Sequence, residues 1–174
     1  MPKIISDLRE TLYAETRRQL NTVGYSALTM RNIAKECGIA VGTLYNYFPS
    51  KEYLVGCVVL EDWKKIYGQM ESGVSRAQSI REGIGLIYEQ LLSFIRQYDP
   101  LFRSDPGALK MSTYSDRHQV LLAQIRELLA ALTARFGPQP ELFTLTFLAE
   151  SILRCGAKPY SYDELWPVFR KILF

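Results

Sequence analysis

Residues 29–48 read TMRNIAKECGIAVGTLYNYF, and the rest of the chain is best interpreted outward from this stretch. Its apolar residues recur at helical spacing in two short segments, which predict one helix over residues 30–37 and another over residues 41–47. Thr29 is a suitable N-cap because its hydroxyl can accept from unpaired backbone amides of the first turn. Gly38 is expected to end the first helix. The pattern therefore predicts a helix-turn-helix.

The apolar side chains of this stretch can close a small core between the two helices. The set comprises Ile33, Ala34, Ile39, Leu44 and Phe48. Ala34 is small, which lets two helices cross closely. In a helix-turn-helix, the second helix enters the major groove of DNA with its N-terminal residues nearest the bases. The alternative is a three-helix unit that packs in this way and binds no nucleic acid.

The outward face of the second helix carries groups that suit DNA. Hydroxyls and an amide able to bond phosphate oxygens come from Thr43, Tyr45, Asn46 and Tyr47. Val41 offers an apolar contact for a thymine methyl, and Gly42 lets the backbone approach closely. The helix has no Lys or Arg of its own, so the neighbouring helices must supply the cations, at Arg31, Lys35 and Lys51.

Lys51 follows Ser50, which is expected to cap the next helix. The helix dipole disfavours a cation at this first position by about 0.3–1 kcal/mol. A phosphate docked against the same helix end would reverse that effect, because the amides and the ammonium would both face an anion. An ordinary exposed lysine is the alternative interpretation.

The remaining sequence predicts helices and almost no strands. The predicted helices cover residues 3–23, 51–72, 80–98, 111–136, 140–155 and 162–173. Gly24 is a left-handed stop, Asp99–Pro100 should end the helix before it, and Pro167 should bend or shorten the last helix. We therefore expect an all-α fold. It comprises an N-terminal three-helix DNA-binding domain over residues 1–50 and a C-terminal helical domain over residues 51–174.

The composition excludes several classes of protein. Of the 174 residues, 48% are hydrophobic, which is typical of a folded chain and not of a disordered one. The absence of a long apolar run or an apolar N-terminal signal predicts a cytoplasmic protein with no membrane partner. The net charge of +3 is too small to indicate nucleic acid by itself. Three scattered cysteines without a CxxC pair predict neither disulfides nor a metal site, and no cofactor is expected.

Residues 5–55 resemble the DNA-binding domain of the tetracycline-repressor (TetR) family. The matching pieces are GY at 24–25, TMRNIA at 29–34, GIA at 38–40, GTLY at 42–45, YF at 47–48 and SKEYL at 50–54. The resemblance implies phosphate contacts at Thr29, Thr43, Tyr47 and Lys51. It implies positions near bases for Arg31, Val41, Gly42 and Asn46, and either role for Tyr45. For residues 56–174 it implies only a helical ligand-binding and dimerisation domain.

A single short helix reads too few bases for high affinity, so we expect a homodimer whose two recognition helices reach successive turns of a palindromic operator. The last two predicted helices are apolar on more than one face and therefore need more than one partner. Candidate interface residues on these helices are Phe143, Phe147, Ile152, Trp166 and Phe169. Packing within the monomer is the alternative for part of this surface.

An effector site is expected among the central helices, where apolar walls combine with a few polar tips as in small-molecule sites. The candidate residues are Trp63, Tyr67, Met70, Tyr88, Leu91, Ile95, Tyr114 and His118. Plain core packing is the alternative for each, and exposure to solvent is a further alternative for His118. A bound effector would favour a spacing of the recognition helices that no longer fits the duplex, with the helix that begins at Lys51 transmitting the change.

The expected function is that of a sequence-specific transcriptional regulator, a repressor that a small molecule releases from its operator. Activation in place of repression stays open. An enzyme is disfavoured, because the chain has no nucleophile elbow, phosphate-binding glycine loop or HExxH, and no catalytic residue is assigned. A helical adaptor that binds only proteins would keep the fold without the phosphate-facing set.

Overall fold

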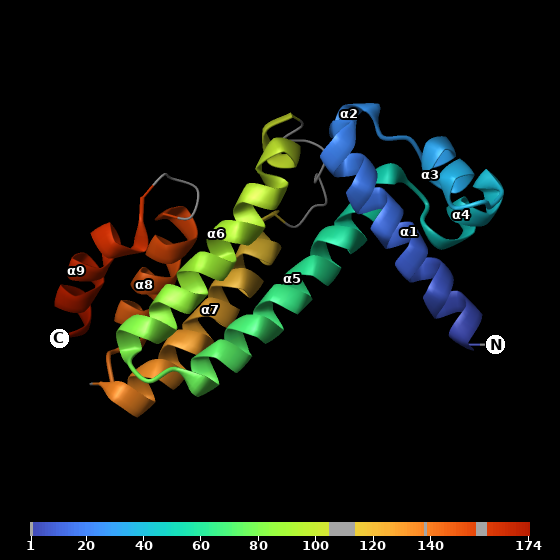
Figure 1. The fold of residues 1–174 in the computed structure, drawn as a ribbon. Coiled ribbons are helices and arrows are strands. Elements are labelled where there is room, and N and C mark those ends of the chain that lie inside the picture. The colour runs from blue at the N-terminus through green and yellow to red at the C-terminus, as the bar shows by residue number, and fades with distance from the viewer. Residues whose placement is uncertain (1, 105–113, 138, 156–159) are drawn as a thin grey trace. The chain divides into compact units, whose positions relative to one another are not determined.

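A computed structural model describes the chain except for residues 1, 105–113, 138 and 156–159. In the described ranges, the protein consists of nine α-helices and no strand, which confirms the all-α prediction (Figure 1). The helices are α1 (Pro2–Thr22), α2 (Gly24–Ala27), α3 (Met30–Glu36), α4 (Val41–Tyr47), α5 (Lys51–Arg76), α6 (Ile80–Ser104), α7 (Tyr114–Phe136), α8 (Leu142–Cys155) and α9 (Tyr162–Leu173). None of the described helices is both long enough and apolar enough to cross a membrane.

The helices form two compact units. The first comprises residues 1–62 together with the end of α6 from Tyr98 onward, and the second comprises residues 63–97 and the chain from α7 to the C-terminus. Both α5 and α6 therefore contribute residues to each unit. The predicted domain boundary after residue 50 stays a prediction.

The first unit is built on α1, against which α2 and α3 pack, while α4 packs on α3. Its core consists of fully buried apolar side chains, among them Leu12, Leu28, Ile33, Ala34, Leu44, Phe48 and Leu54. Gly24 has the left-handed backbone expected of a helix stop, with φ of 78°. The one-turn helix α2, which starts at this glycine and buries Tyr25, was not predicted. Four residues are too short for a recognisable apolar period.

The prediction that Asp99–Pro100 ends its helix was wrong, because α6 continues to Ser104. Proline inside a helix removes one backbone hydrogen bond and costs about 3 kcal/mol. Packing offsets this cost here, since Tyr98 and Leu101 on either side are 3% and 5% exposed. Pro167 likewise does not shorten α9, which keeps its predicted bounds and begins with a capping box between Ser161 and Glu164.

Helix α5 extends one turn beyond its predicted end at residue 72, and a long-range contact supports the extra turn. Arg135 of α7 donates to the carbonyl oxygens of Val74, Ser75 and Ala77 at 2.8, 2.9 and 3.1 Å. These carbonyls lie at the C-terminal end of α5, where no backbone N–H of the helix is left to pair with them. Arg135 therefore acts as a tertiary cap for α5.

In the second unit, α8 packs against both α7 and α9. Two glycines of α6 permit close approach of neighbouring helices. A Cβ on Gly83 would overlap Leu132 of α7, and one on Gly85 would lie 2.8 Å from Tyr162 of α9. The unit therefore depends on small residues at two helix crossings.

Candidate nucleic-acid interface

Helix α3 begins and ends as its local sequence predicts. The Thr29 hydroxyl oxygen accepts a hydrogen bond from the Asn32 amide at 3.2 Å, which confirms Thr29 as the N-cap. Gly38 has a φ of 67° and forms the turn after the helix. Thr29 is exposed, and its O–H remains able to donate to a further acceptor.

Helix α4 turns Leu44 into the core and an opposite face to solvent, as predicted. Leu44 is completely buried, and Phe48 after the helix is nearly so. The exposed residues of the helix are Val41, Gly42, Tyr45, Asn46 and Tyr47, while Thr43 is half-buried. A Cβ built on Gly42 meets nothing within 4 Å, so the backbone there is open to a close partner. The apolar anchor at Leu44 therefore sets which groups this face presents.

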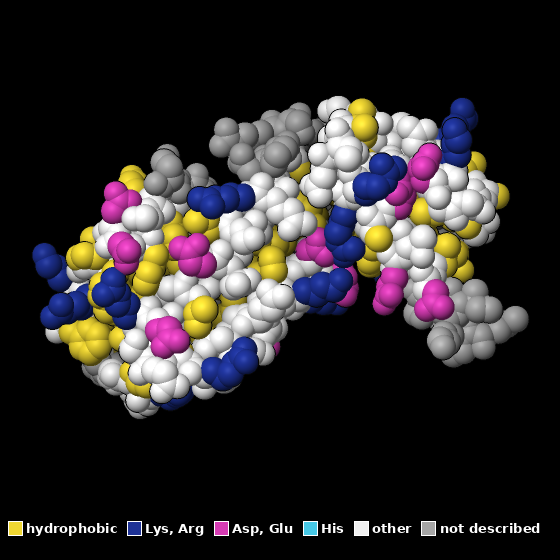
Figure 2. Space-filling model, in the orientation of Figure 1, with side chains coloured by type: hydrophobic (Ala, Val, Ile, Leu, Met, Phe, Trp, Pro, Cys, Tyr) yellow, Lys and Arg dark blue, Asp and Glu magenta, His cyan; other side chains and the backbone are white. Residues whose placement is uncertain are grey.

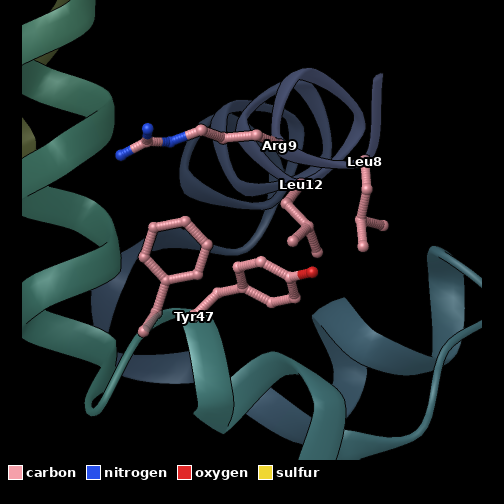
Figure 3. A pocket seen from close by; sticks show the side chains of 5 residues that line it. Leu8, Arg9, Leu12 and Tyr47 are labelled. Carbon is pink, nitrogen blue, oxygen red and sulfur yellow. The ribbon is translucent and has the colours of Figure 1, made fainter. Parts of the chain in front are cut away.

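Tyr47 differs from the other exposed side chains of α4 because part of it lies against α1. Its ring lines a hollow of 160 Å³ together with Leu8, Arg9, Leu12 and Phe48. Figure 3 shows the Tyr47 ring beside Leu12, with its hydroxyl directed toward the Leu8 side. The side chain is 43% exposed. Tyr47 thus serves as a packing contact between α4 and α1 as well as a surface group.

The cations of the first unit fall into two classes. On α1, Arg17 pairs with Asp62, Arg18 pairs with Glu15, and Arg9 donates to the Tyr13 hydroxyl at 2.9 Å. On α3, Arg31 and Lys35 are exposed, and no carboxylate among the described residues pairs with either. Lys and Arg side chains stand out over α3 in Figure 2. Among the described cations of α1 and α3, those open to a new anion therefore lie on α3, the helix next to α4.

Lys51 is not the freely exposed lysine of the alternative interpretation. Its Nζ donates to the Tyr25 carbonyl oxygen at 3.1 Å and lies 4.2 Å from the centroid of the Tyr25 ring. An ammonium has three N–H donors, so others remain for an anion. Ser50 caps α5 as predicted, since its hydroxyl accepts from the Tyr53 amide at 3.1 Å.

The dipole argument for a phosphate at Lys51 is weaker than the sequence suggested. Glu52 lies at the same helix end, and its pKa is lowered by a hydrogen bond from its own backbone amide, with a further bond from the Tyr25 hydroxyl at 3.1 Å. This carboxylate already places an anion where the helix dipole favours one. A phosphate contact at Lys51 stays a prediction that depends on the resemblance.

The residues of the predicted effector site lie in the second unit, and several have protein partners. Met70, Tyr88, Leu91 and Trp63 are buried, Tyr67 and Ile95 are half-buried, and the side chain of Tyr114 lies outside the described residues. The Trp63 indole N–H donates to Gln124 Oε1 at 2.8 Å, and the Tyr88 hydroxyl donates to the Tyr160 carbonyl oxygen at 2.7 Å. These residues contribute to the core, and an effector site among them stays a prediction.

His118 is held by a carboxylate and is not simply exposed. Its Nε2 lies 2.8 Å from Glu150 Oε2, and Arg154 Nε donates to Glu150 Oε1 at 2.7 Å. This pairing joins α7 to α8. Within the described part of the chain, no group of three or more His, Cys, Asp or Glu side chains is arranged to hold a metal ion.

The predicted dimer-interface residues divide into two groups. Phe143 and Phe147 of α8 are 77% and 51% exposed, whereas Ile152 and Phe169 are 0% and 2% exposed. The prediction was wrong for Ile152 and Phe169, because a single chain already buries them; Trp166 is half-buried. Leu142, Val168 and Phe174, which lie on or directly after the same two helices, are also exposed. Figure 2 shows hydrophobic side chains on the surface over α8 and α9.

The sequence of the chain matches a family model and, over part of its length, bacterial transcriptional regulators. The family model "Bacterial regulatory proteins, tetR family" matches residues 12–56. The HTH-type transcriptional repressor KstR of Rhodococcus jostii is 36% identical over 78 residues, or 45% of this chain and 35% of that protein. The HTH-type transcriptional regulator UidR of Escherichia coli is 34% identical over 64 residues, or 37% of this chain and 29% of that protein. The chain thus matches about a third of these relatives' length.

Solved structures resemble the chain over nearly its whole length. A TetR-family regulator of Haemophilus influenzae, HI0893, has a TM-score of 0.57 at 16% identity and covers 97% of this chain and 96% of its own. FadR of Bacillus subtilis, solved in complex with stearoyl-CoA, has a TM-score of 0.62 at 17% identity and covers 94% of this chain and 97% of its own. At these identities the likeness concerns the fold.

Proposed function

We propose that this chain belongs to the tetR family of bacterial regulatory proteins, whose model matches residues 12–56, and that it regulates transcription by binding double-stranded DNA. It acts in the cytoplasm as a homodimeric repressor that a small-molecule effector releases from a palindromic operator. The observation that carries this proposal is the face of α4 that points to solvent. Its residues Val41, Gly42, Tyr45 and Asn46 are all exposed and take no part in the core.

The DNA sequence is recognised by side chains whose hydrogen-bonding groups match the edges of the bases. Arg31 is exposed on α3 with no carboxylate partner in the described ranges, and a guanidinium can donate two bonds to a guanine. Asn46 is exposed on α4, and its amide can pair with an adenine in the same bidentate way. Val41 provides an apolar surface for a thymine methyl, and Gly42 leaves room for the duplex. Tyr45 contacts either a base or a phosphate.

Phosphate contacts fix the register of the protein on the duplex. Thr29 and Thr43 donate from their hydroxyls, and Lys51 uses the N–H groups that Tyr25 leaves open. Tyr47 reaches a phosphate only from the edge of α1, because its ring already packs against Leu12. Its contribution is therefore divided between holding α4 and touching the duplex.

Dimerisation is supported by apolar surface on α8. Phe143 and Phe147 are four residues apart, so they lie on one helical face, and both are largely exposed. A second copy of the chain provides a self-complementary partner for such a face under two-fold symmetry. Each dimer then presents two α4 helices to a palindrome.

The effector is an apolar molecule with few polar groups, bound in the second unit among the side chains of the predicted site. Met70, Tyr88 and Leu91 are at most 2% exposed in the free chain. Binding therefore requires these side chains to rearrange, which couples occupancy of the site to the conformation of the helices that carry them. FadR provides a precedent for a helical fold of this type with an acyl-CoA bound.

The experiment is a titration of a fluorescent duplex that covers the region upstream of the chain's own gene, with a scrambled duplex of equal length as control. We expect tighter binding to the upstream duplex, with affinity that falls steeply between about 50 and 200 mM salt because phosphate contacts release counterions. A protein that ignores both duplexes at the lower salt concentration would refute the proposal.

A further inference from the structure

A chain of polar contacts joins α1, α5 and α6 in the first unit. Asp62 of α5 is 7% exposed, and Arg17 of α1 donates from Nε to its Oδ1 and Oδ2 at 2.8 Å. Arg17 Nη2 lies 2.5 Å from Oδ1 as an ion-pair contact outside hydrogen-bond geometry. Tyr98 of α6, which is 3% exposed, donates its hydroxyl to Oδ2 at 2.5 Å. We refer to Arg17, Asp62 and Tyr98 as the Asp62 cluster.

The Asp62 cluster fixes geometry more than it adds stability. Burying an ion pair removes both charges from water, and this desolvation cancels much of their attraction. Charge-assisted bonds nevertheless require one orientation of donor and acceptor, whereas apolar contacts tolerate sliding. Burial and the neighbouring carboxylate raise the pKa of Tyr98 far above its ordinary value, so the phenol remains a donor at neutral pH. The three helices are therefore held in one register.

Helix α1, which carries Arg17, supports the helices that form the candidate DNA interface. Arg17 lies on α1, α3 packs on α1, and α4 packs on α3. A displacement of α1 relative to α5 therefore moves the exposed face of α4. The Arg17–Asp62 pair bridges these two helices, because its two residues lie on α1 and α5.

Helix α6, which carries Tyr98, needs a directional contact. Pro100 follows Tyr98 by two residues and has no backbone N–H to donate to the Arg96 carbonyl. Leu101, the next residue of α6, is buried, but an apolar contact of this kind is not directional. The phenol of Tyr98 supplies a directional bond at this weak point of α6.

We infer that Arg17, Asp62 and Tyr98 are positioning residues for DNA binding, which hold α1 and the helices packed on it in the register that α4 needs to fit the major groove. The inference rests on the proposed function and adds residues that do not touch DNA. It also gives α6 its own connection to the interface, in addition to the continuous helix α5 that begins at Lys51.

The test compares Tyr98→Phe with Tyr162→Phe. Both variants lose one phenol hydrogen bond, but Tyr162 lies in the second unit and donates to the Arg81 carbonyl. The probe is a duplex selected from a random pool by the wild-type protein, and affinity is measured by fluorescence anisotropy at a temperature where melting curves show both variants folded. We expect Tyr98→Phe to weaken binding about 5- to 30-fold and Tyr162→Phe to leave it within about twofold.

A merely structural role would lower the melting temperature of both variants and leave the affinity of the folded protein unchanged. That outcome, or equal losses of affinity in the two variants, would overturn the inference. Wild-type protein that selects no duplex from the pool overturns the proposed function itself and the inference with it. Wild-type binding with an unaffected Tyr98→Phe overturns the inference alone.

Arg17→Lys provides an independent measurement, and decides the matter if Tyr98→Phe does not fold. It keeps the charge but loses the planar donor that spans both Asp62 oxygens. We expect a loss of affinity in the same range. The double variant should lose less than the product of the two single losses, because both act through the same carboxylate. Losses that multiply fully would show that Arg17 and Tyr98 act separately, contrary to the inference.

Discussion

Arg31→Ala should weaken operator binding strongly and relax the preference for one base, without destabilising the protein. The side chain is exposed on α3, and among the described residues it has no ion-pair partner. Removing an unpaired surface side chain changes folding stability by no more than about 0.5 kcal/mol. The change in binding therefore reports on the contact with DNA and not on the fold.

The magnitude follows from the number of contacts. A bidentate arginine–guanine contact contributes about 1–3 kcal/mol of discrimination. A homodimer has two Arg31 side chains, so the loss per dimer is about 2–6 kcal/mol, or about 30-fold to more than 10⁴-fold in affinity. Lys35→Ala, on the same helix, removes a charge that we assign to a phosphate. Its expected effect is a uniform loss across sequences, with the salt slope reduced by about 0.9 per contact.

The assay is anisotropy titration of the operator and of operators with single-base changes, each at several salt concentrations. Arg76→Ala is the control, since it removes an exposed arginine from the second unit. The reasoning would be refuted if Arg31→Ala bound all duplexes as the wild type does. Uniform weakening on every sequence, as expected for Lys35→Ala, would assign Arg31 to a phosphate instead of a base.

Phe143→Glu combined with Phe147→Glu should convert the dimer to monomers in sedimentation experiments and abolish tight operator binding, because two charges on each chain would face the two-fold-related copy. An unchanged dimer would exclude this face of α8 as the interface. Gly83→Ala should destabilise the second unit by about 1–3 kcal/mol in denaturant melts, because its Cβ would overlap a buried side chain of α7. The matched Gly68→Ala meets nothing within 4 Å and should stabilise α5 by about 0.5–1 kcal/mol, so equal effects would contradict the crossing geometry. Glu52 has a lowered pKa in the folded chain, so its contribution to stability is complete above pH 4.5 and is lost as the pH falls through the folded-state pKa. Glu52→Gln should therefore reduce the loss of folding stability at acidic pH in a curve of stability against pH. An unchanged loss at acidic pH would contradict this.

The fold of the helix-turn-helix could be predicted because its determinants lie close together in the chain. The Thr29 cap, the Gly38 turn and the inward positions of Leu44 and Phe48 depend on bonds or periodicities that span four residues or fewer. For such features, local chemistry and tertiary packing agree. The same locality explains why the exposed face of α4 was predicted residue by residue, with only Thr43 partly covered.

Features created by contacts between distant residues were missed or assigned incorrectly. The hydrogen bond from Lys51 to the carbonyl of Tyr25, a residue 26 positions earlier, was not predicted. Ile152 and Phe169 were assigned to an interface because apolar character alone does not tell whether a side chain meets its own chain or a second copy.

The amino-acid sequence alone determined the helical class, the bounds of α3 and α4, and the groups that α4 presents to solvent. Only the tertiary structure revealed that α6 continues past Pro100 and that Arg17, Asp62 and Tyr98 meet across 45 and 36 positions of the chain. The physical reason is range: helix periodicity and capping act over a few residues, whereas a buried carboxylate takes whichever donors the packing of separate helices brings to it.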